Sequence, residues 1–126
     1  MSSTERIVII DYGMGNLHSV AKAVEKVSPP NTQVIVSDNN SDIDNAHRVI
    51  FPGVGAIRDC MQGLNALDLE KSIKDACLEK PVLGICVGMQ ALCNSSEENG
   101  LVDCLGFFDY KVEFFGHDFS ASASSP

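Results

Sequence analysis

Four short apolar runs, separated by segments with turn or helix character, constrain the fold of this chain more than any other feature. The runs occupy residues 7–10, 34–36, 49–51 and 82–85. Unbroken β-branched runs are typical of strands buried on both faces of a parallel sheet. The segments predicted to be helical are residues 17–27, 56–63, 67–79 and 87–93, and residues 37–45 are predicted to be a polar loop. The alternation predicts an α/β fold, with an open, mostly parallel sheet and helices on both faces.

The length and composition fit one domain. A chain of 126 residues has the length of a domain, and 44% hydrophobic residues are enough for a core. Only 21% of the residues are charged, which argues against disorder. We expect folded structure over residues 1–115, with a hairpin or edge strands over 105–108 and 110–115. The small, polar residues of 116–126 predict a disordered tail.

The charge balance and the cysteines exclude several classes of function. With 9 Lys and Arg against 17 Asp and Glu, the formal net charge is −8, which argues against nucleic acid and anionic membranes as partners. No apolar run approaches the ~20 residues of a membrane span, and the first residues do not resemble a signal peptide, so we expect a cytoplasmic protein. The 5 cysteines are odd in number and never spaced C-x-x-C. We therefore expect no disulfide framework, no metal and no cofactor.

The strongest local signal for chemistry is G-I-C-V-G at residues 84–88. It is the cysteine counterpart of the G-x-S-x-G nucleophile elbow, in which a strand runs into a sharp turn and a helix starts directly after it. Flanking glycines relieve crowding at such a turn, and a helix N-terminus favours a thiolate. Cys86 is therefore a candidate nucleophile, and the backbone N–H of Val87 would point at a developing oxyanion. The alternative is a buried cysteine at a strand end, and packing is our interpretation of the other four cysteines.

Two further glycine-containing loops follow predicted strands. P-G-V-G at residues 52–55 could turn backbone N–H groups toward a ligand and complete an oxyanion hole with Val87, or could be an ordinary turn. Because the carboxyl ends of parallel strands share one edge of the sheet, we expect the loops 11–16, 52–55 and 86–90 to lie close together.

The loop after the first strand has a second interpretation. G-M-G-N at residues 13–16 resembles the first part of the dinucleotide-binding pattern G-x-G-x-x-G, with Asp38 about where a ribose-binding acid belongs. His18 replaces the third glycine, which weakens this interpretation. The other possibility is a capped loop, in which Asn16 is the N-cap of the following helix.

No histidine is predicted to lie where a base for Cys86 is needed. A cysteine nucleophile requires a base, normally a histidine held by a third group. His18 belongs to a predicted helix, His47 precedes a strand at its amino end, and His117 belongs to the predicted tail. The sequence thus contains a nucleophile without a convincing base.

Three motifs occur in an order and spacing that resemble a known family. D-Y-G-M-G-N at residues 11–16, F-P-G-V-G at 51–55 and G-I-C-V-G-M-Q at 84–90 resemble the glutaminase subunits of imidazole glycerol phosphate synthase, which are class I glutamine amidotransferases of histidine biosynthesis. S-E-E at 96–98 and L-G at 105–106 also fit this family. The resemblance implies the flavodoxin-like fold of class I amidotransferases, incomplete at its C-terminal side.

The resemblance implies roles for particular residues. Cys86 would attack the side-chain amide of glutamine and form a γ-glutamyl thioester. Gln90 and Glu98 would bind the amino-acid end of glutamine, although Glu97 is adjacent to Glu98. The oxyanion would be held by backbone amides at Gly53, Val54 and Val87.

The resemblance also implies a partner, and it leaves three interpretations open. Ammonia would pass to a cyclase subunit in a heterodimer, and the loop at Gly15 and Asn16 would face that subunit.

Family members are much longer, and their catalytic histidine and glutamate, spaced H-x-E, have no counterpart here. The chain is then a truncated amidotransferase that is inactive by itself, a non-catalytic relative that binds the cyclase or glutamine, or a nucleotide-binding half-domain.

Overall fold

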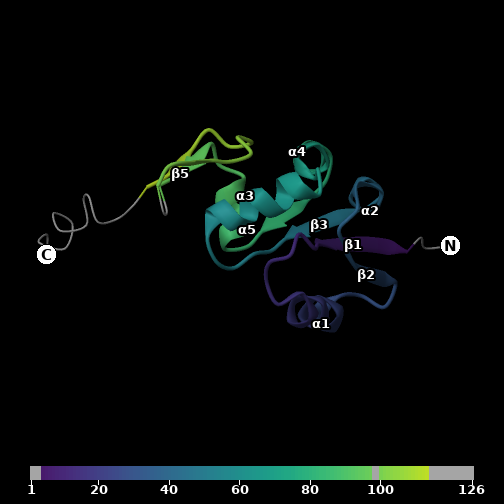
Figure 1. Cartoon of the computed structure of the whole chain (residues 1–126). Helices are drawn as coiled ribbons and strands as arrows, with labels where there is room; N and C mark the ends of the chain where they lie inside the picture. The colour runs from purple at the N-terminus through teal and green to yellow at the C-terminus, as the bar shows by residue number, and fades with distance from the viewer. Residues whose placement is uncertain (1–3, 98–99, 114–126) are drawn as a thin grey trace, which may run out of the picture.

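The computed structural model describes residues 4–97 and 100–113 as a four-stranded sheet with flanking helices and a small three-stranded sheet (Figure 1). The strands of the main sheet are β1 (Glu5–Ile10), β2 (Thr32–Ser37), β3 (Arg48–Phe51) and β4 (Val82–Gly84). The helices are α1 (Leu17–Val27), α2 (Asn40–Asp44), α3 (Ile57–Ala66), α4 (Glu70–Glu79) and α5 (Val87–Ala91). The strand order is β2-β1-β3-β4, and every neighbouring pair is parallel. The predicted α/β class is confirmed.

Helices cover both faces of the main sheet, as predicted. In Figure 1, α1 lies on one side of the strands, and α3, α4 and α5 lie on the other. The main core is on this second side, where alternate residues of each strand point, because successive side chains of a strand face opposite ways. The strand residues in this core include Val8, Ile10, Val49 and Phe51. The helix residues packed against them include Ile57, Cys60, Leu64 and Ile73.

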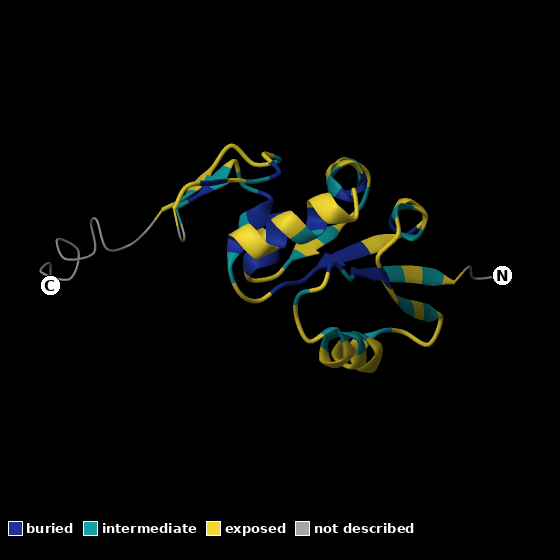
Figure 2. Cartoon of the chain, in the orientation of Figure 1, coloured by how far each residue is buried: buried dark blue, intermediate teal, exposed yellow. Residues whose placement is uncertain are grey.

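The face of the sheet that carries α1 is covered less completely. None of the residues of α1 is buried, in contrast to the dark blue parts of β1 and β3 and the buried faces of α3 and α5 in Figure 2. The strand register places Ile9, Ile50 and Leu83 next to one another on this face. Ile9 is fully buried, whereas Leu83 on the edge strand β4 is 57% exposed. An apolar groove of about 250 Å³, with Ile7, Ile50 and Leu83 in its lining, follows from this incomplete cover.

Two segments differ from the prediction for local reasons. The sequence predicts a polar loop over 37–45, whereas the structure contains α2 there. The side chain of Asn39 accepts a hydrogen bond from the backbone N–H of Asp42 (2.8 Å), which is N-cap geometry, and Ile43 anchors the short helix in the core. The predicted helix over 67–79 begins only at Glu70, because Asp68 has a left-handed φ of 54° that interrupts it.

The predicted strand over 105–108 is wrong. Its backbone N–H groups bind carbonyls at the end of α5 and just beyond: Leu105 to Ala91 (2.8 Å), Gly106 to Cys93 (2.8 Å) and Phe108 to Leu92 (2.9 Å). The segment therefore caps the C-terminal end of a helix and does not pair in a sheet. The small sheet is formed by β5 (Ser95–Ser96), β6 (Val102–Asp103) and β7 (Lys111–Val112), in the order β6-β5-β7. The predicted tail, 116–126, lies outside the described residues.

No helix within 4–97 and 100–113 is long and apolar enough to span a membrane.

The exposed apolar residues of the α1 face predict self-association. We expect Leu83→Lys to raise the dissociation constant of self-association by about tenfold, because it places a charge on an exposed apolar face and an edge strand. Leu78→Lys is the matched control, since Leu78 is 75% exposed on α4. Sedimentation velocity over a range of protein concentrations measures the effect. A chain that is monomeric throughout, or an equal response to both substitutions, would contradict the prediction.

Candidate active site

Three loops meet at the carboxyl ends of β1, β3 and β4, as predicted. In a doubly wound sheet, a ligand binds where neighbouring strands send their chains to opposite faces. Here that point lies between β1, which leads to α1, and β3, which leads to α3 on the other face (Figure 1). A Cβ built on Gly15 would lie 3.8 Å from the Cα of Gly53, and one built on Gly53 would lie 2.5 Å from Cγ1 of Val87. The loops 11–16, 52–55 and 86–90 thus touch one another.

Cys86 occupies a strained turn between β4 and α5. Its φ of 56° and ψ of −123° are a conformation that L-residues rarely adopt. The residue before it, just past the end of β4, is still hydrogen-bonded to β3, since the N–H of Ile85 binds the carbonyl of Phe51 (3.0 Å). The helix α5 begins directly after Cys86, and the carbonyl of Cys86 accepts a hydrogen bond from the N–H of Met89 in its first turn (3.0 Å). Cys86 is exposed. This geometry is that of a nucleophile elbow, and the alternative of a buried cysteine is wrong.

The two glycines that flank Cys86 are required by close packing. A Cβ on Gly84 would lie 3.0 Å from the Cα of Met89 in α5. A Cβ on Gly88 would overlap the carbonyl oxygen of Phe51 at the end of β3. Both contacts are with backbone, which cannot move aside as the end of a flexible side chain can. The glycines therefore allow α5 to lie directly against β3 and β4, which fixes the position of the elbow.

The amides predicted to form an oxyanion hole belong to residues of different exposure. Val87 is almost completely buried and is the first residue of α5, where the backbone N–H has no carbonyl of its own helix to bind. Gly53 is buried against Val87, whereas Val54 is 59% exposed. The contact between Gly53 and Val87 brings two of the three residues together, and their role stays a prediction.

The structure describes one of the two predicted substrate-binding residues, Gln90. Gln90 belongs to α5, one turn after Cys86, and is half-buried. Its Oε1 atom is buried and has no hydrogen-bond partner within the described part of the chain. Such an acceptor is costly unless something binds it. Glu98 lies outside the described residues.

The predicted partner-facing loop is exposed and ordered by local hydrogen bonds. The Asn16 side chain accepts a hydrogen bond from the N–H of Ser19 (3.3 Å), which confirms Asn16 as the N-cap of α1. Gly15 has a φ of 99°, which favours glycine at that position. Both residues are exposed.

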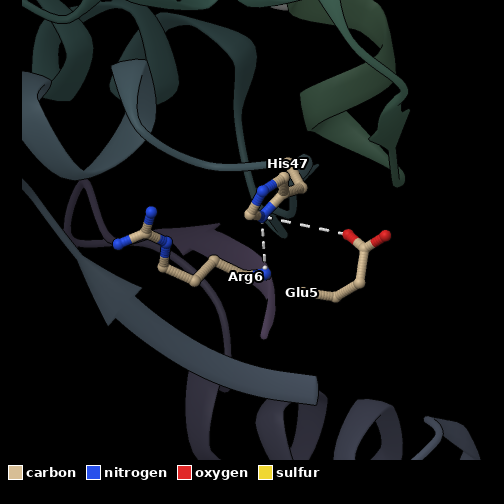
Figure 3. Close-up of polar contacts among 3 residues, drawn as sticks. All are labelled: Glu5, Arg6 and His47. Carbon is tan, nitrogen blue, oxygen red and sulfur yellow. Dashed lines mark hydrogen bonds and ion pairs between the residues drawn. The ribbon is translucent and has the colours of Figure 1, made fainter. Parts of the chain in front are cut away.

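Within the described part of the chain, neither His18 nor His47 is hydrogen-bonded to Cys86. His47 lies at the amino ends of β1 and β3, the edge of the sheet opposite Cys86. Figure 3 shows its ring next to Glu5 and Arg6 of β1. Its Nδ1 accepts the N–H of Arg6 (2.9 Å) and lies 3.9 Å from a carboxylate oxygen of Glu5. His18 is exposed on α1. His117 lies outside the described residues.

The other four thiols are in more buried surroundings than Cys86. Burial raises the pKa of the Cys60 thiol, which is in the core, and the pKa of the Cys77 and Cys93 thiols. Burial also raises the pKa of Cys104 to about 11. These groups are therefore held as neutral thiols near neutral pH. Cys60, Cys77 and Cys104 pack in or against the core, as predicted.

Tyr12 lies next to the site, and its contact there is not predicted by any sequence motif. Tyr12 is buried (3% exposed), and its hydroxyl donates a hydrogen bond to the carbonyl of Pro52 (2.6 Å). In the sequence, Tyr12 is only one letter of a turn-rich loop, and no spacing rule indicates a contact 40 residues away. The sequence offers one indication of this role: Tyr12 is an aromatic residue that follows a buried strand and precedes two glycines of a turn.

Comparisons with known proteins agree with this geometry. Residues 8–122 match the family described as "Glutamine amidotransferase class-I", and the chain belongs to this family. A Pseudomonas putida protein named "Imidazole glycerol phosphate synthase subunit HisH" is 53% identical over 114 residues, which cover 90% of this chain and 53% of the relative. A Methylococcus capsulatus protein of the same name is 48% identical over 120 residues, which cover 95% of this chain and 55% of the relative. The chain thus spans about half the length of the curated relatives it matches.

The packing of Gly88 can be tested against a glycine that has free space. We expect Gly88→Ala to lower the free energy of unfolding by about 3 kcal/mol or more, because the new Cβ overlaps the Phe51 carbonyl. In Gly13→Ala, the control, the Cβ meets no described atom within 4 Å, so only the left-handed backbone (φ 93°) is strained, at about 1–2 kcal/mol. Urea denaturation measures both values. Equal losses would refute the packing role of Gly88.

The strain at Cys86 predicts an unusual order of stability. Cys86→Gly is expected to be more stable than Cys86→Ala by about 1 kcal/mol, because only glycine adopts the observed φ of 56° without strain. Cys77 in α4 is the control, where the glycine variant is expected to be less stable than the alanine variant by about 1 kcal/mol. The midpoints of urea denaturation give both differences. The same order at both positions would show that the elbow is unstrained.

Proposed function

We propose that this chain carries the nucleophile of a glutamine amidotransferase that acts as the glutaminase subunit of imidazole glycerol phosphate synthase. The observation that carries the proposal is the strained, exposed Cys86 at the point where three loops meet. Family membership supports a glutamine-dependent reaction, and the names of the relatives support the particular synthase. The same findings favour this function over a nucleotide-binding half-domain.

In the proposed reaction, the Cys86 sulfur forms a bond to the side-chain carbonyl carbon of glutamine. The carbonyl oxygen becomes an oxyanion, which the amides of Gly53, Val54 and Val87 would bind. The C–N bond then breaks, and the nitrogen leaves as ammonia after gaining a proton. Water hydrolyses the resulting γ-glutamyl thioester, which releases glutamate and restores the thiol. Both steps need a group that moves protons.

The proposed substrate contacts lie on one side of Cys86. The unpaired, buried Oε1 of Gln90 can accept a hydrogen bond from the ammonium group of glutamine, which would satisfy it. Glu98 would supply a negative charge to the same ammonium group. These two residues would hold the amino-acid end of glutamine while its side chain reaches the elbow.

The proposed partner is the cyclase subunit of the synthase, in a heterodimer located in the cytoplasm. The relatives are named as one subunit of a synthase, which implies another subunit. The exposed loop with Gly15 and Asn16 borders the site and is the surface that would face this partner. Ammonia released at Cys86 would then pass to the cyclase, which completes a step of histidine biosynthesis.

The proposed activity needs a base that the described residues do not supply. We expect the 126-residue chain by itself to release ammonia from glutamine at a negligible rate, since general acid–base catalysis typically contributes about 10²–10⁴-fold and the members of a catalytic triad act as a unit. A chimera restores the missing groups, in which residues 4–113 replace the matching segment of the Pseudomonas putida relative. It is assayed with the other subunit of that synthase present.

The chimera is expected to release ammonia from glutamine, and Cys86→Ala is expected to lower the rate by at least about 10⁴-fold. Cys93→Ala is the control, because Cys93 lies beyond α5, and it is expected to retain activity. A folded chimera that binds the other subunit without releasing ammonia would contradict the proposal and indicate a non-catalytic relative. Binding of a mononucleotide that Cys86→Ala leaves unchanged would indicate the nucleotide-binding alternative.

A further inference from the structure

Tyr12 connects the loop after β1 to the loop after β3. Its ring packs edge-on against Phe51 at the end of β3, with 5.5 Å between ring centroids and an interplanar angle of 73°. A Cβ on Gly63 of α3 would lie 2.6 Å from the backbone carbonyl oxygen of Tyr12 and 3.3 Å from Cδ2 of its ring. Tyr12 is therefore packed closely against both β3 and α3, and its hydroxyl has a defined position.

The hydroxyl of Tyr12 binds the backbone just before the predicted oxyanion residues. It donates to the carbonyl of Pro52 at 2.6 Å, in a buried position. The Cys60 thiol lies close enough to interact with the same hydroxyl. Burial raises the pKa of Tyr12, and the nearby Cys60 and Cys86 raise it further, so the hydroxyl keeps its proton and remains a donor. The proton is thus available for the Pro52 carbonyl throughout the normal pH range.

This hydrogen bond determines the direction of the next backbone N–H. The peptide bond between Pro52 and Gly53 is trans, and a trans peptide is planar, with its C=O and N–H pointing opposite ways. A carbonyl held toward Tyr12 therefore directs the N–H of Gly53 away from Tyr12. Rotation of this peptide would break a buried hydrogen bond, which is unfavourable.

The position of Gly53 leaves little freedom for any other arrangement. A Cβ on Gly53 would overlap the Tyr12 hydroxyl and would lie 2.5 Å from Cγ1 of Val87. The Cα of Gly53 is thus enclosed between the tyrosine hydroxyl and the residue that follows the nucleophile. Val54, the next residue, is 59% exposed and lacks such an enclosure.

We propose that Tyr12 is a positioning residue, whose hydroxyl fixes the Pro52–Gly53 peptide and thereby aims the Gly53 amide for the oxyanion. The catalytic part of this inference rests on the proposed function, in which that amide binds the oxyanion. The structural part, that the hydroxyl immobilises this peptide, can be tested separately on the 126-residue chain. Tyr12→Phe removes one oxygen atom and keeps the ring that packs on Phe51.

The first test measures backbone motion by ¹⁵N relaxation. We expect an order parameter of about 0.85 at the Gly53 amide in the unmodified chain and below about 0.6 in Tyr12→Phe. Ile73→Val is the control for general loss of stability, because Ile73 is fully buried in α4 and distant in sequence from the loop. Tyr110→Phe controls for removal of a hydroxyl, because Tyr110 is 70% exposed. Both controls are expected to leave Gly53 rigid.

An unchanged order parameter in Tyr12→Phe, or the same decrease in Ile73→Val, would overturn the inference. The second test uses the chimera, where Tyr12→Phe is expected to lower kcat by about 10–100-fold with little change in KM for glutamine, since an oxyanion contact acts in the transition state. A rise in KM at constant kcat would also overturn it. An inactive chimera with Tyr12 intact would refute the proposed function, and the relaxation result would still decide whether Tyr12 fixes the peptide.

Discussion

The close contact between α5 and the end of β3 is the constraint on which the rest of the site depends. The carbonyl of Phe51 accepts the N–H of Ile85 at 3.0 Å and lies directly under Gly88. The sheet bond before Cys86 and the helix bond after it leave only a left-handed φ for the residue between them. Strain of this kind persists when the surrounding structure determines the conformation more strongly than the residue opposes it. The exposed thiol is therefore a consequence of backbone packing.

The strand that leads to Cys86 is also the edge of the described sheet. Leu83 in β4 is exposed at this edge, and Cys86 follows β4 after one residue. A strand added parallel to β4 would lie about 5 Å away and would end at the same edge of the sheet as Cys86. The proton-transfer group that the proposed reaction needs could reach the thiol from there. His47 cannot be this proton-transfer group, because it lies at the opposite edge of the sheet, where its ring accepts the backbone N–H of Arg6 (Figure 3).

Much of this arrangement could be predicted from the sequence because it depends on local patterns. Unbroken β-branched runs predicted the parallel strands, and the glycines around Cys86 predicted an elbow, since both follow from steric rules that act within a few residues. The segment 105–108 could not be predicted, because its apolar character fits a strand, whereas its amides bind carbonyls at the end of α5. The role of Tyr12 was hidden for the same reason: its hydroxyl binds Pro52, 40 residues further along the chain. Contacts between distant segments decide such cases, and local patterns do not encode them.

The central claim is that Cys86 forms a covalent intermediate with glutamine. Rapid acid quenching of the active chimera during turnover, followed by mass spectrometry of its peptides, tests this claim most directly. The account predicts a γ-glutamyl adduct on the peptide that contains Cys86, formed before ammonia release reaches its steady rate and absent from Cys86→Ala. Steady release of ammonia with no adduct, or an adduct on any of the other four cysteines, would contradict it.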